Sequence, residues 1–428
     1  MKPKTLTLLL IIWVLLVVAL LTRSSNLAWL ALPFFIYLGT GLWQAPTLNS
    51  ARLQAVRTLK KTAASQGDAH QIEVQVTVSN QGPPITNLYL EDVVPAEAKL
   101  CDGKAGLRTA LPNAAQAVLS YSIGDKRGGY DWETIRAVVS DPFDLFDLPV
   151  VLPARASIQV QPEYPQYRRL SLRPRGTLHS PGSIPARLGG NGVDFWGVRE
   201  YHPGDSLRWL DWRLTARHPQ HLFTKEFEQE EIADIGLILD ARQKTDVPRL
   251  AGRDSLFEHS VSAAASLAEA FLHEGHRMSL LSINGATKAV FPGYGKVQLN
   301  RMLRFLAQIK PGANSQADSM EFLPVHMFSS HALLIVISSL AQNDWALFPR
   351  LRSCNFQVLL VSPNPFDFVA QMFGQDRVSR LALRAARLER QLLLRDIGAL
   401  QIPVIDWHVD QPLYPLIRHA LNSPLVRS

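Results

Sequence analysis

The chain begins with two apolar stretches that are joined by a very short polar link. No charged residue occurs over residues 5–22, and after Arg23 none occurs over residues 27–43. Each stretch approaches the roughly 17–25 residues that a membrane-spanning helix needs. Because a backbone in lipid must satisfy its own hydrogen bonds, the pattern predicts a transmembrane helical hairpin within residues 1–50, with these two stretches as its spans.

A cleaved signal peptide is the competing interpretation of the first stretch, because Lys2 and Lys4 precede it. However, a second apolar stretch follows at once, and no clean small-residue cleavage site lies between the two. Basic residues precede the first span and follow the second, and such residues are enriched on the cytoplasmic side of spans. We therefore expect two retained spans, both termini in the cytoplasm, and a cytoplasmic body after residue 50.

Apolar and polar residues alternate with a period of two after a basic linker that we place at residues 51–68. One run would place four apolar residues on the same strand face: Ile72, Val74, Val76 and Val78. Gly and Pro clusters separate further strand candidates at 87–94, 117–123 and 134–140. The pattern predicts a small antiparallel β-sandwich over residues 69–161, for which a spacer role is the simplest interpretation.

Continuous apolar runs replace this alternation beyond a Pro-, Arg- and Gly-rich linker at residues 162–190. The first run, residues 235–240, is typical of a buried parallel strand. The sequence after this run predicts a helix from Ser255 to Glu274, since Ser255 and Glu258 have the spacing of a capping box. Helical patterns separate most of the later runs, which lie at 278–283, 333–338, 356–362 and 402–407. Such a succession predicts a doubly wound α/β domain with a parallel sheet within residues 191–428.

A helical segment at residues 376–396 is rich in arginine, and its arginines are Arg377, Arg380, Arg384, Arg387, Arg390 and Arg395. Five residues give the segment an apolar face: Val378, Leu381, Ala385, Leu388 and Leu392. Such a helix could lie against anionic lipid or an acidic partner. An ordinary solvated helix face is the more common alternative.

The segment at residues 191–231 combines unlike charges with tryptophan. Gly204 predicts a turn, and Asp205 would then cap a helix that runs to about Ala216. Arg208 and Asp211, three residues apart, would pair on that helix. The segment is therefore the densest cluster of interacting side chains that the sequence predicts.

Two interpretations of this segment compete. It could form a carboxylate–arginine site for hydrolysis or phosphate binding. It could instead form a hydrogen-bonded ion network that fixes the segment to the α/β domain. No cysteine, glycine-rich phosphate loop or nucleophile elbow accompanies the block. We therefore favour the structural network and assign no catalytic residue.

The same segment carries a motif with many parts: Asp194, Arg199, Tyr201, Gly204, Asp205, Arg208, Asp211, Trp212, Arg213, Arg217 and Glu226. This motif resembles the signature of the bacterial domain-of-unknown-function-58 family, and the DPFDLF run at residues 141–146 resembles another part of it. The resemblance implies a C-terminal domain similar to a von Willebrand factor A domain. It also implies a bacterial inner (cytoplasmic) membrane location and a MoxR-type AAA+ ATPase as partner, with the motif serving structure or docking.

A von Willebrand factor A domain often binds Mg²⁺ through an Asp-x-Ser-x-Ser run after its first strand, a threonine and a later aspartate. Oxygen ligands of this kind suit that hard cation. In this sequence Asp240 matches, but Arg242 and Lys244 replace both serines, and Ser339 lies where the later aspartate would be. Two positive charges oppose cation binding, so we expect a degraded site without a metal or another cofactor.

Composition narrows the remaining classes of function. The net charge of +7 is modest for 428 residues and does not by itself indicate nucleic-acid binding. The two cysteines, Cys101 and Cys354, lie far apart and match no zinc or redox pattern. No nucleic-acid partner is therefore expected.

The sequence predicts a membrane-anchored, non-enzymatic adaptor whose partners are the AAA+ ATPase and the lipid bilayer. Two alternatives stay open. One is a metal-dependent adhesion-type receptor, which would need the intact metal ligands. The other, with less support, is a carboxylate-dependent hydrolase that uses Asp194, Asp205, Asp211 or Glu226.

Overall fold

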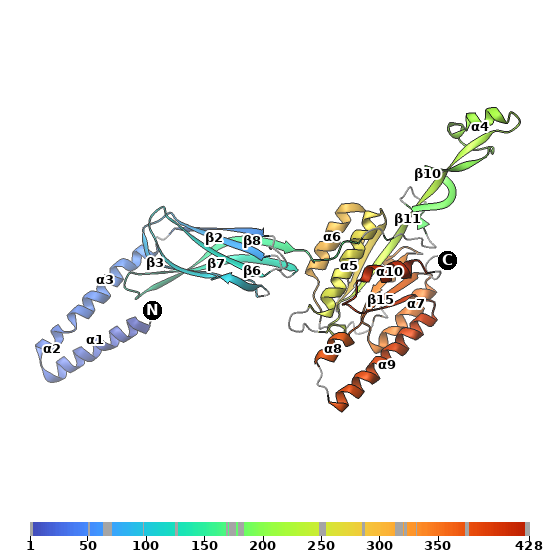
Figure 1. Cartoon of the computed structure of the whole chain (residues 1–428). Coiled ribbons are helices and arrows are strands. Elements are labelled where there is room, and N and C mark those ends of the chain that lie inside the picture. The colour runs from blue at the N-terminus through green and yellow to red at the C-terminus, as the bar shows by residue number, and fades with distance from the viewer. Residues whose placement is uncertain are drawn as a thin grey trace. The chain divides into compact units, whose positions relative to one another are not determined.

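The computed structural model divides the chain into two compact units, residues 1–160 and 161–428 (Figure 1). The first unit carries three helices and an antiparallel sandwich, and the second carries a mixed α/β sheet. The structure describes residues 3–49, 52–62, 71–96, 98–124, 127–167, 170, 177–178, 184–247, 254–284, 287–312, 320, 323–330, 332–372 and 376–423.

The helices of the first unit are α1 (Pro3–Thr22), α2 (Ser25–Trp29) and α3 (Leu32–Asn49). Among the described residues, one helix is long and apolar enough to cross a membrane, at Lys4–Thr22. The second predicted span, 27–43, is not a single helix, because Leu30 and Ala31 separate α2 from α3. Pro33 lies in the first turn of α3 and lacks the N–H that a helix continuing from α2 would need. One helix that could span a membrane is therefore described, and the hairpin of two spans stays a prediction.

The sandwich consists of two four-stranded antiparallel sheets, with the strand orders β1-β2-β6-β4 and β5-β3-β7-β8. Their bounds are β1 (Leu53–Thr62), β2 (Gln71–Asn80), β3 (Ile85–Asp92), β4 (Lys99–Gly103), β5 (Gly106–Leu111), β6 (Gln116–Gly124), β7 (Gly128–Ser140) and β8 (Asp147–Val160). The alternating residues of β2 are fully buried, as predicted: Ile72, Val74, Val76 and Val78.

β1 occupies most of the segment that was predicted as a basic linker at residues 51–68. It pairs with β2 along its whole length, and its Leu53 and Leu59 pack against the sandwich core. The sequence does not indicate this strand, because one inward position of β1 is the basic residue Arg57, which interrupts the apolar face.

Arg57 is a core residue with its own set of partners. Its Nε donates to Asp92 Oδ2 at 3.2 Å, and neither side chain is exposed to solvent. The Tyr121 hydroxyl donates to the same carboxylate at 2.8 Å, and Trp132 Nε1 donates to that hydroxyl at 3.0 Å. Burial, and then the charge of Asp92, raise the pKa of Tyr121 above its ordinary value. A buried charge is thus satisfied within the sandwich.

The second unit is built on a mixed, mostly parallel sheet with the strand order β13-β12-β11-β14-β15-β16. The strands are β9 (Thr177–Leu178), β10 (Ile184–Glu200), β11 (Phe223–Asp240), β12 (Arg277–Ile283), β13 (Thr287–Gly293), β14 (Leu333–Ile337), β15 (Gln357–Pro363) and β16 (Val404–Trp407). Neighbours in this order are parallel except β12 and β13. The predicted parallel sheet is confirmed, with an antiparallel edge strand that the apolar runs did not reveal.

Helices cover both faces of this sheet (Figure 1). The helices of this unit are α4 (Trp212–Arg217), which lies away from the sheet, α5 (Leu256–His273), α6 (Gly295–Gln308), α7 (Leu347–Ser353), α8 (Phe366–Met372), α9 (Arg377–Ala399) and α10 (Leu413–Leu421). One core joins α5, α6 and α10 to sheet residues such as Leu237, and another joins α7 and the end of α9 to residues such as Ile238. α5 begins at its predicted cap, where the Ser255 hydroxyl accepts the N–H of Glu258. Packing on both faces is typical of a doubly wound domain.

β10 and the first half of β11 form a long antiparallel hairpin that leaves the sheet and ends in α4 (Figure 1). We call this hairpin, residues 184–231, the arm. The second half of β11, from Asp234 onward, lies in the sheet next to β12. Most of the charged block at 191–231 is therefore held away from the sheet.

The predicted helix from Asp205 to about Ala216 is wrong. A single 3-10 turn at Leu207–Trp209 and the shorter α4 replace it. Leu210 lies between them in an extended conformation and pairs with Thr224 of β11. Pairing across the arm thus interrupts the helix that the local sequence favours.

Candidate functional site

Arg199 organises the tip of the arm. Its Nη1 and Nη2 donate to the two carboxylate oxygens of Asp205 at 2.8 and 2.7 Å, and its Nε donates to Glu226 at 3.1 Å. The N–H of His202 also donates to Asp205, at 2.9 Å. The hydrogen bond from Arg199 is the main cause that lowers the pKa of Asp205. Gly204 allows the turn, because its φ of +113° is a conformation that other residues rarely adopt.

Asp211 fixes the short helix at the tip. Its carboxylate accepts hydrogen bonds from the N–H of Arg213 at 3.1 Å and of Leu214 at 3.0 Å, and so caps α4. Asp205 was the predicted cap, but its carboxylate is bound to Arg199. Within the described part of the chain, no ion pair joins Asp211 to Arg208, contrary to the expectation from their spacing.

Backbone hydrogen bonds close the tip. The Tyr201 N–H donates to the Leu222 carbonyl at 2.8 Å, and the Asp211 N–H donates to the Phe223 carbonyl at 2.8 Å. These contacts join parts of the motif to one another within the arm, whereas the sequence predicted a network that fixes the segment to the α/β domain. Asp194 belongs to β10, and its side chain lies outside the described residues.

Several large side chains of the tip face solvent. Leu207 is 65% exposed, Trp212 is 67% exposed and Leu222 is 47% exposed. Three arginines of the same segment are also exposed: Arg208, Arg213 and Arg217. We call these six residues the tip surface. Apolar and arginine side chains held together on a braced turn are typical of protein-binding surfaces.

A second arginine–carboxylate cluster lies at the carboxyl edge of the sheet, where β11 and β14 end. Asp240 ends β11 and accepts hydrogen bonds from Arg242 Nε at 2.8 Å and Nη2 at 2.7 Å. Arg242 Nη1 and Nη2 also donate to Asp344, at 2.8 and 2.7 Å. Ser338, directly after β14, donates to Asp240 at 2.7 Å. We call these four residues the edge cluster.

The edge cluster is closed to solvent. The side chains of Arg242, Asp240 and Asp344 are 4%, 1% and 0% exposed. Burial alone would lower the pKa of Arg242, but the hydrogen bonds and charges of the two carboxylates outweigh burial and raise it. A guanidinium therefore lies between two buried carboxylates, where a hard cation would otherwise find oxygen ligands.

The other expected metal position has a different role. The Ser339 hydroxyl donates to the Thr245 carbonyl at 2.6 Å, which ties the end of β14 to the loop after β11. Within the described ranges, no group of three or more His, Cys, Asp or Glu side chains could hold a metal ion.

Arg390 of α9 closes the neighbouring part of this sheet edge. Its Nη1 donates to the Ser339 carbonyl at 2.8 Å, and its Nη2 donates to Ser362 Oγ at 2.9 Å and to Asp406 at 2.8 Å. It thereby joins the ends of β14 and β15 to β16. The sequence grouped Arg390 with the other arginines of this helix. Arg390 lies one helical turn from Leu393, on the face that packs on the sheet. This position is the signal that could have distinguished it from the exposed arginines of the helix.

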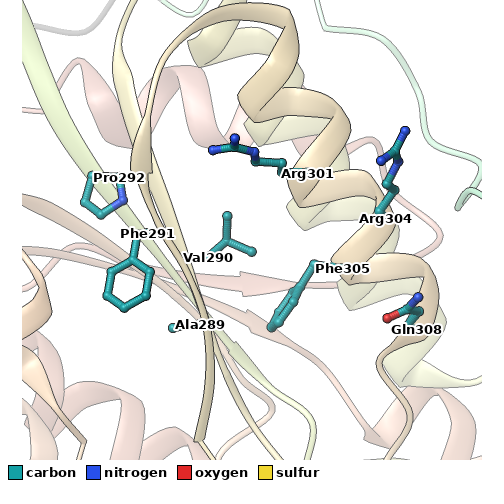
Figure 2. Close-up of a pocket in the computed structure, with 8 residues that line it drawn as sticks. All are labelled: Ala289, Val290, Phe291, Pro292, Arg301, Arg304, Phe305 and Gln308. Atoms are coloured by element: carbon teal, nitrogen blue, oxygen red, sulfur yellow. The ribbon is translucent and has the colours of Figure 1, made fainter.

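A pocket lies between the edge strand β13 and α6 (Figure 2). Val290 and Phe305 form apolar parts of its lining (Figure 2). The side chain of Arg301 extends from α6 toward β13, whereas that of Arg304 points away from Val290 (Figure 2). The full lining is Ala289, Val290, Phe291, Pro292, Arg301, Arg304, Phe305 and Gln308. These residues supply no carboxylate, hydroxyl or thiol, so the pocket lacks side chains for general-base or nucleophilic hydrolysis. The sequence did not indicate this pocket, because it depends on β13 being the edge strand.

The chain is similar to several bacterial proteins. The family model described as "Protein of unknown function DUF58" matches residues 197–365. The uncharacterized protein YeaD of Bacillus subtilis (strain 168) is 31% identical over 285 residues, which are 64% of this chain and 66% of that protein. The uncharacterized protein Rv1480 of Mycobacterium tuberculosis (strain ATCC 25618 / H37Rv) is 32% identical over 140 residues, which are 31% of this chain and 38% of that protein. The chain thus matches just under two thirds of the first relative and well under half of the second.

Two solved structures are similar to a quarter of the chain. The CARDB domain of the PF1109 protein from Pyrococcus furiosus has a TM-score of 0.18 and 16% identity, covering 26% of this chain and 93% of that one. The FixG-related protein from Vibrio parahaemolyticus has a TM-score of 0.16 and 12% identity, covering 25% of this chain and 95% of that one. TM-scores this low bear neither on function nor on the fold of the whole chain.

Proposed function

Since the chain belongs to the DUF58 family, we propose that it is a membrane-anchored, non-enzymatic adaptor whose C-terminal unit docks a MoxR-type AAA+ ATPase. The choice of ATPase rests on the family resemblance. The adaptor role rests on one observation, the tip surface: Trp212 and Leu207 are 67% and 65% exposed on a turn that Arg199 and Asp205 hold in place. Exposed aromatic and arginine side chains on a rigid support are the usual anchors of protein interfaces.

The second unit is proposed to be a von Willebrand factor A-like domain. Its central strand β11, its antiparallel edge strand β13 and its helices on both faces support this assignment. In such open sheets, ligands usually bind at the carboxyl edge where the strand order reverses. β11 and β14 meet at that point, and the buried edge cluster fills it. Docking through the arm therefore has more support than ligand capture at this edge.

We place the chain in the bacterial inner membrane as a protein with two spans and cytoplasmic termini. Two contacts support a hairpin, because α1 and α3 both contact the same loop, residues 141–146. The Thr5 hydroxyl of α1 donates to the Leu145 carbonyl at 2.8 Å, and the Tyr37 hydroxyl of α3 donates to the Phe143 carbonyl at 3.3 Å. The Asp141 carboxylate shapes this loop by accepting the Leu145 N–H at 2.7 Å.

The alternatives have less support. A metal-dependent receptor would need an accessible cation, and Arg242 takes the place between Asp240 and Asp344. For a hydrolase, Asp205 and Glu226 are bound to Arg199, and Asp211 caps α4. These carboxylates have structural partners, so neither alternative is favoured by a specific observation.

The test is capture of the ATPase by the full chain in lipid nanodiscs, with and without ATP, followed by mass spectrometry. We expect a MoxR-type AAA+ ATPase that is retained in a nucleotide-dependent manner. Trp212→Ala should abolish this retention, because it removes the largest exposed apolar side chain of the tip surface. Phe291→Ala is the matched control, because Phe291 is 74% exposed in the same unit but outside the arm.

Retention that is equal in Trp212→Ala and the unaltered chain would contradict docking through the tip surface. Absence of any AAA+ ATPase from the capture by the folded chain would contradict the adaptor role. Loss of retention in both Trp212→Ala and Phe291→Ala would indicate that the ATPase docks on a surface other than the tip surface. Hydrogen exchange of β11 checks that each variant is folded.

A further inference from the structure

α9 (Arg377–Ala399) has two faces with opposite environments. One face packs on the sheet through Arg390 and Ile397, which are its buried residues, and through the partly buried Leu393 and Leu394. These four residues follow the spacing of a single helix face. The second half of α9 is therefore attached to the sheet by one side of the helix, and the Arg387 guanidinium also lies over the Phe366 ring of α8, 5.9 Å from its centroid.

The other face carries an apolar stripe that the domain leaves exposed. Val378 is 74% exposed, Leu381 is 58% exposed, Leu388 is 53% exposed and Leu392 is 50% exposed. With the exposed Ala385, the spacing alternates between three and four residues over four helical turns. Large apolar side chains repeated on one line mark an interaction surface more strongly than scattered ones do. We call Val378, Leu381, Ala385, Leu388 and Leu392 the α9 stripe.

Positive charge borders this stripe. Five arginines of α9 are exposed: Arg377, Arg380, Arg384, Arg387 and Arg395. At 100° per residue, Arg377 and Arg384 lie directly beside the stripe, on the same side. The exposed carboxylates within α9, Glu389 and Asp396, lie beside the stripe on its other side, so the arginines border one side of it. Five exposed arginines against two exposed carboxylates still give the exposed surface of the helix an excess of positive charge.

We propose that the α9 stripe lies on an anionic membrane surface. A helix with an apolar line, flanking arginines and low overall hydrophobicity is suited to the interface between headgroups and acyl chains. The arginine stems reach along the apolar surface while the guanidinium groups contact lipid phosphates. Anionic phosphate is the partner chemistry that the excess of arginine selects.

Pairing with a second copy fits the same stripe less well. The position that continues the stripe after Leu392 is Arg395. A parallel pair of α9 helices would place two Arg395 side chains, each 3.8 Å from its own Asp396, at the end of the seam, where a further apolar side chain would be needed to continue it. A lipid surface offers phosphate to the same arginine instead.

The inference goes beyond the proposed docking of an ATPase, and it rests on the proposed membrane anchor only for the nearness of lipid. It adds a second attachment that involves the C-terminal unit. Such an attachment would restrict the orientations in which the arm meets a cytoplasmic partner. Two attachments on one chain also strengthen each other through effective concentration.

The test uses the full chain in proteoliposomes, with both exposed cysteines replaced (Cys101→Ser and Cys354→Ser). Leu388→Cys carries an environment-sensitive fluorophore, and the vesicles contain a lipid with a nitroxide at a shallow depth. The matched control is Val297→Cys, a 66% exposed apolar position of α6, which covers the opposite face of the sheet. Vesicles of phosphatidylcholine with phosphatidylglycerol are compared with vesicles of phosphatidylcholine alone.

We expect quenching at position 388 in the anionic vesicles, little in the neutral ones, and none at position 297 in either. Reversing the charges with Arg377→Glu, Arg380→Glu and Arg384→Glu together should abolish the quenching. Absence of quenching at 388 in anionic vesicles would overturn the inference. A blue-shifted but unquenched label would also overturn it, because it would indicate a protein partner such as a second copy.

Alkaline carbonate extraction of the same vesicles separates this inference from the proposed anchor. A chain that resists extraction but is unquenched at 388 retains the anchor and overturns the α9 contact. A chain that is released by carbonate but was quenched at 388 before extraction supports the α9 contact and contradicts the anchor.

Discussion

The arm and the sheet edge use the same chemistry in opposite environments. Arg199 holds Asp205 by a two-pronged contact at 2.7 and 2.8 Å, and Arg242 holds Asp344 by the same geometry at the same distances. The side chain of Arg199 is 36% exposed, whereas that of Arg242 is 4% exposed. The two clusters therefore differ in their access to water and not in the contact itself.

This difference decides what each cluster does for the protein. Water and salt screen an exposed ion pair, so its net contribution to stability is small. A buried pair has lost its hydration, so removing one partner leaves the other charge without compensation. We conclude that the arm cluster shapes a local turn, while the edge cluster holds together the carboxyl ends of β11 and β14.

The largest expected effect is that of Arg242→Ala. It leaves Asp240 and Asp344 buried without a counter-charge, and breaking a buried pair in this way costs about 3–5 kcal/mol. We expect a large decrease in the free energy of unfolding of the second unit. Hydrogen exchange of the β11 and β14 amides in the full chain measures it. The free energy of unfolding of Arg242→Lys should lie between that of the unaltered chain and that of Arg242→Ala. An ammonium keeps the positive charge, but it cannot donate two-pronged hydrogen bonds to both carboxylates. A change no larger than that of Arg199→Ala would break the comparison.

A second prediction concerns what replaces the guanidinium. Arg242→Ser removes the charge and adds a hydroxyl next to Asp240, Asp344 and Ser338, which leaves a set of oxygen ligands. We expect Mg²⁺ or Mn²⁺ to raise the Tm of this variant and to leave that of the unaltered chain unchanged, because binding to the folded state alone is stabilising. Thermal unfolding with and without the ion is the measurement. Equal responses of the two chains would mean that Arg242 does not occupy a cation position.

The third prediction is a local effect in the arm. Arg199→Ala should leave the stability of the sheet nearly unchanged but should speed amide exchange at Tyr201 and Asp205, because the turn loses its brace. Arg208→Ala is the matched control, since Arg208 is exposed on the same tip and the hydrogen bonds described for the turn are made by Arg199, Asp205, His202 and Glu226. Slower or unchanged exchange in Arg199→Ala would show that the backbone bonds alone hold the tip.

The smallest expected effect is a response of the tip to acid. The contact with Arg199 lowers the pKa of Asp205 in the folded chain below its unfolded value of about 4. The contribution of Asp205 is therefore complete above the unfolded pKa, and it is lost as the pH falls through the lowered folded pKa. Amide exchange at the tip, corrected for its intrinsic pH dependence, should rise in that acidic window. Asp205→Asn should remove this pH dependence of amide exchange at the tip. If the variant and the unaltered chain show the same pH dependence, another group causes it.

Parts of the fold follow directly from local patterns. The alternation of β2 predicted its buried face, the apolar run at 235–240 predicted a central strand, and Ser255 predicted the start of α5. Each of these depends on residues close together in the chain, so the sequence is sufficient. The resemblance to the DUF58 family was likewise carried by local motifs, at residues 191–231 and 141–146, and the family model matches residues 197–365.

The candidate site was predicted in its members but not in its arrangement. The sequence named Arg199, Asp205, Asp211 and Glu226, yet it assigned Asp205 as a helix cap and paired Asp211 with Arg208. Cross-strand pairing of Leu210 with Thr224 ends the local helix and frees Asp205 for Arg199. Asp344 was missed, because it lies more than a hundred residues from its partner Arg242.

The sequence by itself determined several elements of this protein, such as β2, the central part of β11 and α5, together with their apolar faces and the identity of every charged residue. Only the tertiary structure decided which of those faces and charges are buried. The apolar stripe of α9 is exposed because Arg390 and Ile397 turn the other side of the helix toward the sheet. Arg242 is buried because β11 and β14 bring two distant carboxylates to the same edge. Burial is a property of the whole packed chain, and it sets the cost of every charge and the availability of every apolar surface.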